Sequence, residues 1–276
     1  MAASSLLLLQ PAAMIAAANP LDEIIEKVQK YIQARDLPNA RAELSRGMRE
    51  FPNEGGLYSL LGVIEAQDGN YPAAETAFKR AIVEIPRLTG AYLNLGRLYQ
   101  ENTAKDPEAV KKALETYDKL LRFQPANKEA LYQSALLSLQ QESYPTALER
   151  LARLPAADQE YPQALAVKCA ALGATCKPVE AEVVANRLLE NRDATEADVY
   201  LPVPHLETHG ASDLAEKLLR AQAEQRQGSY ASYYALGLFY KRQKKLEAGR
   251  AALEKAAQYR PDDAPLLLDL ARVAYD

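Results

Sequence analysis

Only two histidines occur in this chain, and their spacing is the first pattern that could do chemistry. His205 and His209 are four residues apart, which places both on one helix face and suits zinc binding. Metalloproteases carry a glutamate directly after the first histidine, whereas Glu207 stands two residues after it here. The nearby sequence offers no third ligand, and Pro204 weakens a local helix. We expect two solvated histidines; the alternative function is a metal-binding or enzyme-associated subunit using this pair.

The two cysteines, Cys169 and Cys176, are seven residues apart and do not form a CxxC pair. Within one helix their Cα atoms would lie about 10 Å apart, too far for a disulfide, but a turn between them could close that distance. We expect Cys169 to be a buried thiol at a small core position. Because the sequence also has no phosphate-binding loop and no G-x-S-x-G motif, we predict no catalytic residue, no cofactor, no metal and no enzymatic activity.

The overall composition is that of a folded protein with mixed charge. Of the 276 residues, 48% are hydrophobic and 25% are charged, and 33 Lys and Arg face 37 Asp and Glu, giving a net charge of −4. These values exclude wholesale disorder and disfavour a nucleic-acid partner. The one basic run, residues 241–245, is interpreted as a solvated turn at a helix end.

The N-terminal segment has no charged residue before Asp22. It is apolar and ends in Ala16-Ala17-Ala18, which resembles a signal-peptidase site before Asn19, although no Lys or Arg stands at its start. Residues 1–20 are therefore interpreted as a cleaved signal peptide, or as a disordered or packed tail. Export to a periplasmic or secreted location is the expectation, with a cytoplasmic location as the alternative. We expect no transmembrane segment in the mature chain.

A repeat is the strongest signal in the sequence. Pro52 and Pro86, each at the end of an apolar segment, are 34 residues apart. Pro125 follows after 39 residues, which is 34 plus an insertion of five, and Pro261 follows 136 residues later, four times 34. A proline directly after a helix is common because it cannot continue the helix. The spacing therefore predicts repeated helical hairpins.

Residues inside these intervals recur at matching positions. The recurring set is Tyr58, Leu61, Gly62, Ala74, Phe78 and Ala81, then Tyr92, Leu95, Gly96, Tyr99, Ala113 and Tyr117, and later Tyr233, Leu236, Gly237, Tyr240, Leu253 and Ala256. With these residues the chain resembles the tetratricopeptide repeat (TPR) family, whose signature is W-x2-L-G-x2-Y, A-x3-F and P. The resemblance implies an all-α, right-handed α-solenoid of about seven helix-turn-helix units plus a terminal helix.

The repeat period assigns a range to each unit. The expected units are residues 21–54, 55–88, 89–127, 128–161, 162–195, 196–229 and 230–263, with a terminal helix at 264–276. Glu101–Glu108 is the insertion, with Asp106 expected to cap a helix whose first residue is Pro107. Pro202 and Pro204 should kink or shorten the first helix of the sixth unit. Small residues such as Gly62 and Gly237 should lie where paired helices cross.

The resemblance implies that the inner face of the first helices binds peptides or partner segments. One inner position recurs every 34 residues as Tyr132, Ala166, Tyr200 and Tyr234. The expected partner-binding residues are Tyr132, Tyr200, Tyr234, Asn94, Arg97, Gln133 and Lys241. Tyrosines at this position are suited to adaptable recognition, but they are equally expected to pack between units. Both interpretations remain open at this stage.

These patterns together predict a non-catalytic scaffold for a protein or peptide partner, in cell-envelope assembly or secretion. The terminal helix from about Ala264 is apolar on most sides, and it carries Leu267 and Leu270 at signature positions of a further unit. A solenoid that ends in water needs a polar capping face. We therefore expect this helix either to pair with another copy or to belong to a longer array.

Overall fold

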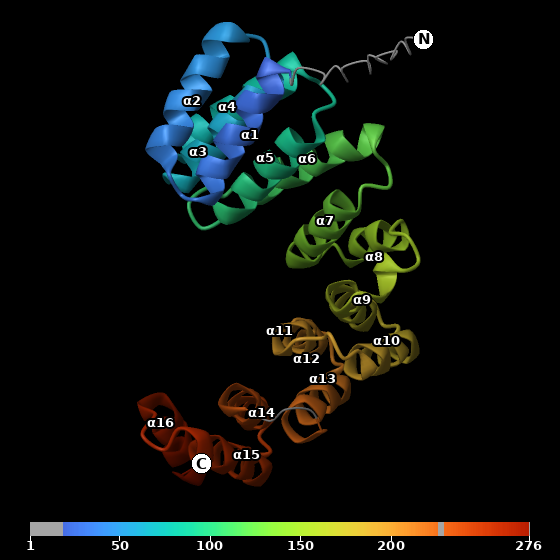
Figure 1. The fold of residues 1–276 in the computed structure, drawn as a ribbon. Helices are drawn as coiled ribbons and strands as arrows, with labels where there is room; N and C mark the ends of the chain where they lie inside the picture. The colour runs from blue at the N-terminus through green and yellow to red at the C-terminus, as the bar shows by residue number, and fades with distance from the viewer. Residues whose placement is uncertain (1–18, 226–228, 276) are drawn as a thin grey trace, which may run out of the picture. The chain divides into compact units, whose positions relative to one another are not determined.

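A computed structural model describes residues 19–225 and 229–275. Across these ranges the chain forms helices and turns and contains no strand, so the all-α prediction is confirmed (Figure 1). The expected signal-peptide segment lies outside the described residues, except that Asn19 caps the first helix and Pro20 is its first residue. The chain divides into two compact units, Met1–Leu98 and Tyr99–Asp276.

Most helices follow one another as antiparallel pairs, with α1 packed on α2, α3 on α4, α7 on α8, α9 on α10 and α14 on α15. The helices are α1 Pro20–Gln33, α2 Leu37–Glu50, α3 Gly55–Gln67, α4 Tyr71–Glu84, α5 Thr89–Glu101, α6 Ala109–Phe123, α7 Lys128–Gln140, α8 Tyr144–Ala152, α9 Pro162–Ala174, α10 Pro178–Glu190, α11 Glu196–Tyr200, α12 Val203–Thr208, α13 Ser212–Arg220, α14 Tyr230–Arg242, α15 Leu246–Tyr259 and α16 Ala264–Tyr275. A 3-10 turn, η1 Asp158–Glu160, and a π-helical turn, η2 Ala221–Gln225, lie between them.

The periodic prolines lie where the sequence predicts. Pro52, Pro86, Pro125 and Pro261 each stand two residues after the last residue of α2, α4, α6 and α15. The carbonyl groups of the first two also accept hydrogen bonds. The hydroxyl of Tyr58 donates to Pro52 O at 2.9 Å, and that of Tyr92 donates to Pro86 O at 3.0 Å. A tyrosine in place of the signature tryptophan thus binds the preceding turn to the next helix.

Left-handed backbone conformations mark the turns inside the helical pairs. They occur at Arg35, Gly69, Glu142, Cys176, Gly210 and Lys244, with φ between 54° and 80°. The first two are 34 residues apart, and the last four follow one another at intervals of 34. The turn geometry therefore keeps the repeat period through the middle units, whose sequence departs most from the signature. Glycine, which takes this conformation without steric cost, occupies only two of these positions.

The core lies between the paired helices, and small residues set how closely the helices approach. Gly62 of α3 faces the buried ring of Phe78, and a Cβ atom there would lie 2.5 Å from Phe78 Cε1. Gly237 of α14 faces the buried Leu253 of α15, and a Cβ atom on Gly237 would lie 2.6 Å from Leu253 Cδ2. Ala135 is likewise fully buried in α7. The prediction that small residues lie at the crossings is confirmed at Gly62 and Gly237.

The prediction is confirmed for the proline-containing segment near residue 202 but not for the start of α6. The predicted effect of Pro202 is confirmed, because α11 ends at Tyr200 after five residues and α12 starts at Val203. The predicted start of α6 is wrong. That helix begins at Ala109 with Glu108 as its N-cap, because Pro107 and Glu108 form a turn closed by the hydrogen bond from Ala109 N to Asp106 O at 3.0 Å, while the Asp106 carboxylate accepts from Glu108 N at 2.9 Å.

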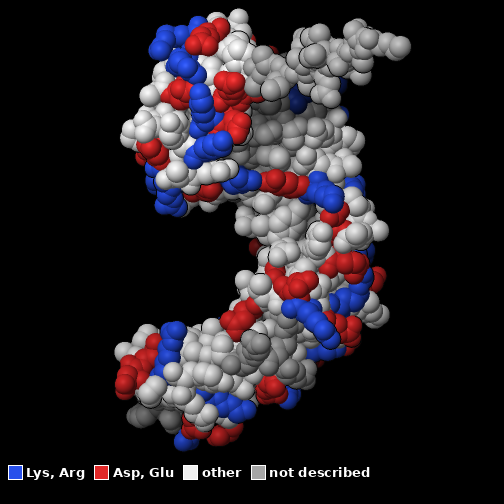
Figure 2. Space-filling model, in the orientation of Figure 1, with Lys and Arg blue, Asp and Glu red and all other residues white. Residues whose placement is uncertain are grey.

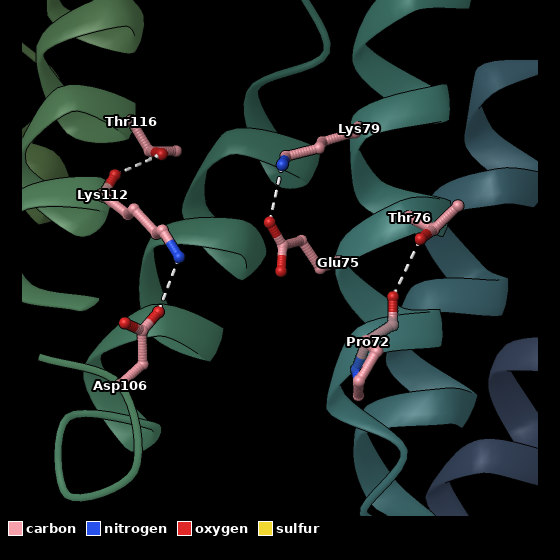
Figure 3. A network of polar contacts seen from close by, with 7 residues as sticks. All are labelled: Pro72, Glu75, Thr76, Lys79, Asp106, Lys112 and Thr116. Carbon is pink, nitrogen blue, oxygen red and sulfur yellow. Dashed lines mark hydrogen bonds and ion pairs between the residues drawn. The ribbon is translucent and has the colours of Figure 1, made fainter. Parts of the chain in front are cut away.

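Asp106 also fastens the inserted turn to α6. Its other carboxylate oxygen accepts from Lys112 Nζ at 2.6 Å, and the Lys112 carbonyl accepts from the hydroxyl of Thr116 at 2.7 Å (Figure 3). The side chain of Asp106 is three-quarters buried in this contact, and its hydrogen bonds from Lys112 and Glu108 lower its pKa. The ion pair between Asp106 of the insertion and Lys112 of α6 therefore holds the inserted turn against the helix.

The terminal helix α16 begins at Ala264, as the sequence predicts. Leu266 and Val273 are buried against α14 and α15, whereas Leu267 and Leu268 are 48% and 53% exposed. The helix thus packs on one side and presents leucines to solvent on another. Among the described residues, no helix combines the length and apolar character that a membrane span requires.

Candidate functional site

The predicted partner-binding residues divide between the two compact units. Asn94, which is half-buried, and Arg97, which is exposed, lie on α5 in the unit Met1–Leu98. The other five residues lie in the unit Tyr99–Asp276 on α7, α11 and α14, and they are Tyr132, Gln133, Tyr200, Tyr234 and Lys241. Each unit is therefore considered separately.

Tyr132 and Gln133 of α7 are both half-buried. Burial, and then the negative charge of Asp198, raise the pKa of the Tyr132 hydroxyl. Gln133 Oε1 accepts a hydrogen bond from Gln100 Nε2 at 3.1 Å, and Gln100 Oε1 in turn accepts from the hydroxyl of Tyr117 at 2.6 Å. One acceptor of Gln133 is thus used inside the unit, while part of each side chain reaches the surface.

Tyr200 ends the short helix α11, just before the break at Pro202. Its ring is half-buried, and its hydroxyl oxygen is buried without a hydrogen bond to any residue that the structure describes. Burial, and then the negative charge of Glu196, raise the pKa of this hydroxyl, and the nearby Ser232 side chain partly offsets the rise. An unsatisfied buried hydroxyl costs about 1–3 kcal/mol, so this group retains an unused capacity for hydrogen bonding.

Tyr234 and Lys241 of α14 share one carboxylate. The Tyr234 hydroxyl donates to Asp269 Oδ2 at 2.8 Å, and Lys241 Nζ lies 2.7 Å from Asp269 Oδ1. Burial opposes ionisation of Asp269, but the hydrogen bonds from Lys241 and Tyr234 outweigh it and lower its pKa. The Tyr234 ring also stacks on Tyr230, with centroids 5.5 Å apart and planes 21° apart. Two of the predicted partner-binding residues therefore bind α16 in this structure.

The 34-residue tyrosine position consequently serves different purposes along the chain. Ala166 is fully buried, Tyr200 has a buried hydroxyl with no hydrogen-bond partner among the described residues, and Tyr234 contacts α16. Sequence reasoning missed the role of Asp269. Its position 35 residues after Tyr234, one repeat plus one residue, was the available signal.

The basic run at residues 241–245 lies at the end of α14 and in the turn after it, as the sequence predicts, and Arg242, Lys244 and Lys245 are exposed, but three of its side chains also form ion pairs. Lys241 contacts Asp269, as described above. Arg242 forms a bidentate ion pair with Glu207, with N–O distances of 2.8 and 3.2 Å. Lys245 Nζ lies 2.5 Å from Glu216 Oε2. These pairs link α14 and the turn after it to α12 and α13. Figure 2 shows the same mixing of signs over the visible face of the molecule.

The histidine pair of α12 flanks an aromatic ring. Tyr144 of α8 meets His205 and His209 edge-on, with ring centroids 5.9 and 5.1 Å apart. Its hydroxyl lies 3.4 Å from His205 Nδ1, and His209 Nδ1 lies 2.9 Å from the carbonyl of His205. Both histidines are half-buried, so the expectation of two solvated histidines is wrong, because α12 packs them against α8. Within the described ranges, no group of three or more His, Cys, Asp or Glu residues could hold a metal.

Both cysteines are free thiols. Cys169 is fully buried in α9, its Sγ lies 3.8 Å from the carbonyl oxygen of Ala181, and burial raises its pKa to about 12. The expectation of a buried thiol at Cys169 is confirmed. Cys176 is exposed, because it occupies the left-handed position of the turn between α9 and α10. A buried, protonated thiol is a poor nucleophile.

Successive antiparallel helix pairs with a 34-residue turn period define a helical-repeat protein. Comparison with known proteins names the repeat, since models of the tetratricopeptide repeat family match residues 25–88 and 230–263. The chain therefore carries tetratricopeptide repeats in both compact units, and this fold generally serves as a scaffold for protein interactions. No curated protein matches the chain.

Solved structures share this fold at low sequence identity. A tetratricopeptide repeat protein from Parabacteroides merdae is 20% identical with a TM-score of 0.63, over 93% of this chain and 99% of that one. The C-terminal part of a TPR repeat-containing protein from Cytophaga hutchinsonii is 10% identical with a TM-score of 0.59, over 89% and 99%. PilW, a type IV pilus biogenesis factor, is 17% identical with a TM-score of 0.56, over 75% and 95%. Identities this low establish a common fold alone.

Proposed function

We propose that the chain is a non-catalytic scaffold that binds an extended peptide or partner segment on the face of its first helices. In the unit Tyr99–Asp276 the contact residues are Tyr132, Gln133 and Tyr200, with Tyr234 and Lys241 next to α16. Asn94 and Arg97 are the contact residues on α5. Half-buried tyrosine and amide side chains support this choice, because they offer apolar area and hydrogen bonds at low entropic cost.

The observation that carries the proposal is the buried hydroxyl of Tyr200, which lacks a hydrogen-bond partner within the described residues. Buried polar groups in folded proteins are nearly always paired, so an exception calls for an explanation. A polar atom of a bound segment would pair with this hydroxyl and recover part of its desolvation cost. The contact of Tyr234 and Lys241 with Asp269 illustrates the chemistry, since one hydroxyl and one ammonium group on a first helix hold one carboxylate of another helix.

Tyr200→Phe separates binding from packing. Removing a buried hydroxyl that has no partner among the described residues should leave the free protein as stable as before, or up to about 1 kcal/mol more stable, while weakening partner binding severalfold. Partners are first captured by cross-linking to the wild-type chain in the native host. Each captured protein is then titrated against wild type, Tyr200→Phe and the triple variant with Ala at Tyr132, Tyr200 and Tyr234.

Tyr161→Ala is the matched control, because that tyrosine is 59% exposed and lies in the turn before α9. The control should bind like wild type, and the triple variant should keep its helical circular dichroism. If the triple variant binds every captured partner with unchanged affinity, these rings serve packing alone and the proposed binding face is wrong.

We also propose that α16 pairs with α16 of a second copy. Leu267 and Leu268 are about half exposed on a helix whose opposite side is already packed, and burying them gains roughly 25 cal/mol per Å² of apolar surface. Light scattering should show a dimer that dissociates in Leu267→Glu and Leu268→Glu. Ala264→Glu adds the same charge at an exposed position near the start of the helix and should stay dimeric. A wild-type monomer at tens of micromolar would exclude pairing.

Export and a role in cell-envelope assembly or secretion are further parts of the proposal. They are supported by the apolar residues 6–18, with the small residues before Asn19, and by the fold shared with PilW. The mature N-terminus from the native host should be Asn19 or close to it, and a chain that retains Met1 in the cytosol would contradict export.

The alternative, a metal-binding or enzyme-associated subunit, is tested by the metal content of the purified chain. If the wild-type chain contains stoichiometric zinc and the double variant His205→Ala, His209→Ala contains none, that alternative is established.

A further inference from the structure

A small socket opens on the side of α14 that faces α13 and α15, away from the residues that contact α16. Its volume is about 180 Å³. The floor consists of Tyr233, Leu236 and Tyr240 from α14 and Ala248, Ala251 and Ala252 from α15. The rim consists of Arg220, Glu224 and Lys255. Small-molecule sites usually measure about 300–1,000 Å³, so this socket has room for one large side chain.

Small side chains on α15 and a π-helical turn after α13 border the open socket. Ala248, Ala251 and Ala252 lie on one face of α15 at helical spacing, and their methyl groups leave room above the rings of Tyr233 and Tyr240. On the other side α13 continues into the π-helical turn η2, which carries Glu224 of the rim. Such wide turns often occur at functional sites. The floor is apolar and the rim is charged, as in pockets that hold interface anchor residues.

The cations of the rim differ in what they bind. Arg220 pairs with Glu224 at 3.2 Å. Lys255 Nζ lies 5.3 Å from the ring centroid of Tyr233, and it forms no ion pair with any residue in the described part of the chain. The carboxylate of Glu254, its neighbour in sequence, is held by Arg250 at 2.9 Å. The charge of Lys255 is therefore left for an external group.

An earlier repeat shows what Lys255 lacks. Arg80 of α4 stands 175 residues earlier, five repeats plus the five-residue insertion, and it likewise lies over a tyrosine ring, at 5.6 Å from the centroid of Tyr58. Arg80 is also ion-paired with Glu84. The residue equivalent to Glu84 in α15 is Tyr259, which stacks on Tyr233 with centroids 6.0 Å apart. The later repeat has kept the cation over the ring and replaced its carboxylate with an aromatic side chain.

We propose that this socket docks a segment of a partner protein that inserts one apolar side chain and sets a carboxylate beside it on Lys255. The apolar side chain covers Leu236, Tyr240 and the three alanines. The carboxylate takes the place that Glu84 fills next to Arg80, and Glu224 does not oppose it because Arg220 neutralises that group. This site is separate from the first-helix face of the proposed function.

Three synthetic peptides with a Gly/Ser background test the socket on the full chain. The first carries Leu followed by Glu, the second carries Leu followed by Lys, and the third carries Ala followed by Glu. The chain, labelled with 15N and deuterium, is titrated with each peptide up to a few millimolar, a range that suits one anchor residue plus one ion pair. Only the first should bind measurably, with amide shifts concentrated in α14, α15 and the end of α13, and the other two should bind at least fivefold more weakly.

Two variants and their matched controls make the result specific. Ala251→Leu fills the socket and should weaken the Leu-Glu peptide about tenfold, whereas Thr76→Leu at the equivalent position of α4 should have no effect. Lys255→Glu should reverse the preference between the Glu and Lys peptides, whereas Lys244→Glu should not. Equal binding of the Glu and Lys peptides, unchanged binding by Ala251→Leu, shifts confined to other helices, or no binding at all would each overturn the proposal.

Discussion

The glycine at the crossing of α3 and α4 allows a direct test of how these pairs are packed. A Cβ atom on Gly62 would lie 2.5 and 2.6 Å from two ring carbons of Phe78, whose side chain is 1% exposed. Carbon atoms settle about 3.5–4.0 Å apart, so Gly62→Ala forces the ring or the helix to move by about 1 Å. Overpacking of this kind costs about 1–3 kcal/mol, against a gain of about 1 kcal/mol from replacing glycine inside a helix. We expect a net loss of up to about 2 kcal/mol.

Gly90→Ala supplies the control in the same compact unit. Gly90 is an exposed residue in the first turn of α5, and no atom of the described residues outside its own helical turn lies within 4 Å of the position a Cβ atom would take. This substitution keeps the gain of replacing glycine and adds no clash, so it should leave stability unchanged or raise it by up to about 1 kcal/mol. The difference between the two variants, about 1–3 kcal/mol, isolates the clash at the helix crossing.

Urea unfolding followed by circular dichroism measures the two variants, and amide hydrogen exchange in α3 and α4 shows whether the loss is local. Adding Phe78→Leu to Gly62→Ala should cost less than the sum of the two single changes, with a coupling of about 0.5–3 kcal/mol. If Gly62→Ala is as stable as Gly90→Ala, or if the double variant is additive, the two helices are not in the contact described here.

Three further outcomes follow from single side chains. Lys244→Gly should raise stability, and Gly69→Ala should lower it, by about 1 kcal/mol each in urea titrations, because both residues have a left-handed φ. A thiol reagent at about pH 8 should modify Cys176 at once and Cys169 only in denaturant, because burial raises the Cys169 pKa to about 12. Burial, and then a neighbouring imidazolium, lower the His205 pKa below 6.5, so the folded state binds a proton more weakly than the unfolded state. The melting temperature should therefore fall as pH drops below about 6.5, and His205→Gln should flatten that dependence.

The helices themselves follow from local signals in the sequence. Each periodic proline stands two residues past a helix, the proline pair at 202 and 204 breaks α11 from α12, and α16 begins at Ala264. These features depend on one residue and its immediate neighbours, because a missing amide hydrogen and a fixed φ act within one turn. They could be predicted from a single sequence for that reason.

The contacts between helices were harder to anticipate. Tyr144 meets His205 across 61 residues, and Asp269 reaches Tyr234 across 35. Neither pair is marked by a sequence motif, because each depends on which turn of one helix lies against which turn of another. The left-handed turn residues were missed for a different reason. Four of the six are Arg, Glu, Cys or Lys, which favour no such conformation, so only their 34-residue spacing reveals them.

A repeat position therefore fixes where a side chain lies but not what it contacts. The position of Tyr234 also holds Tyr200, and the former donates to a carboxylate of α16 while the latter has no hydrogen-bond partner among the described residues. The position of Lys255 also holds Arg80, and within the described part of the chain only Arg80 has a carboxylate paired with it beside its tyrosine. One copy of the repeat thus serves as a control for another, because it shows which group completes the hydrogen bond or ion pair at that position. Where that group is missing from another copy, a partner protein can supply it, and so comparison between repeats locates sites that no motif marks.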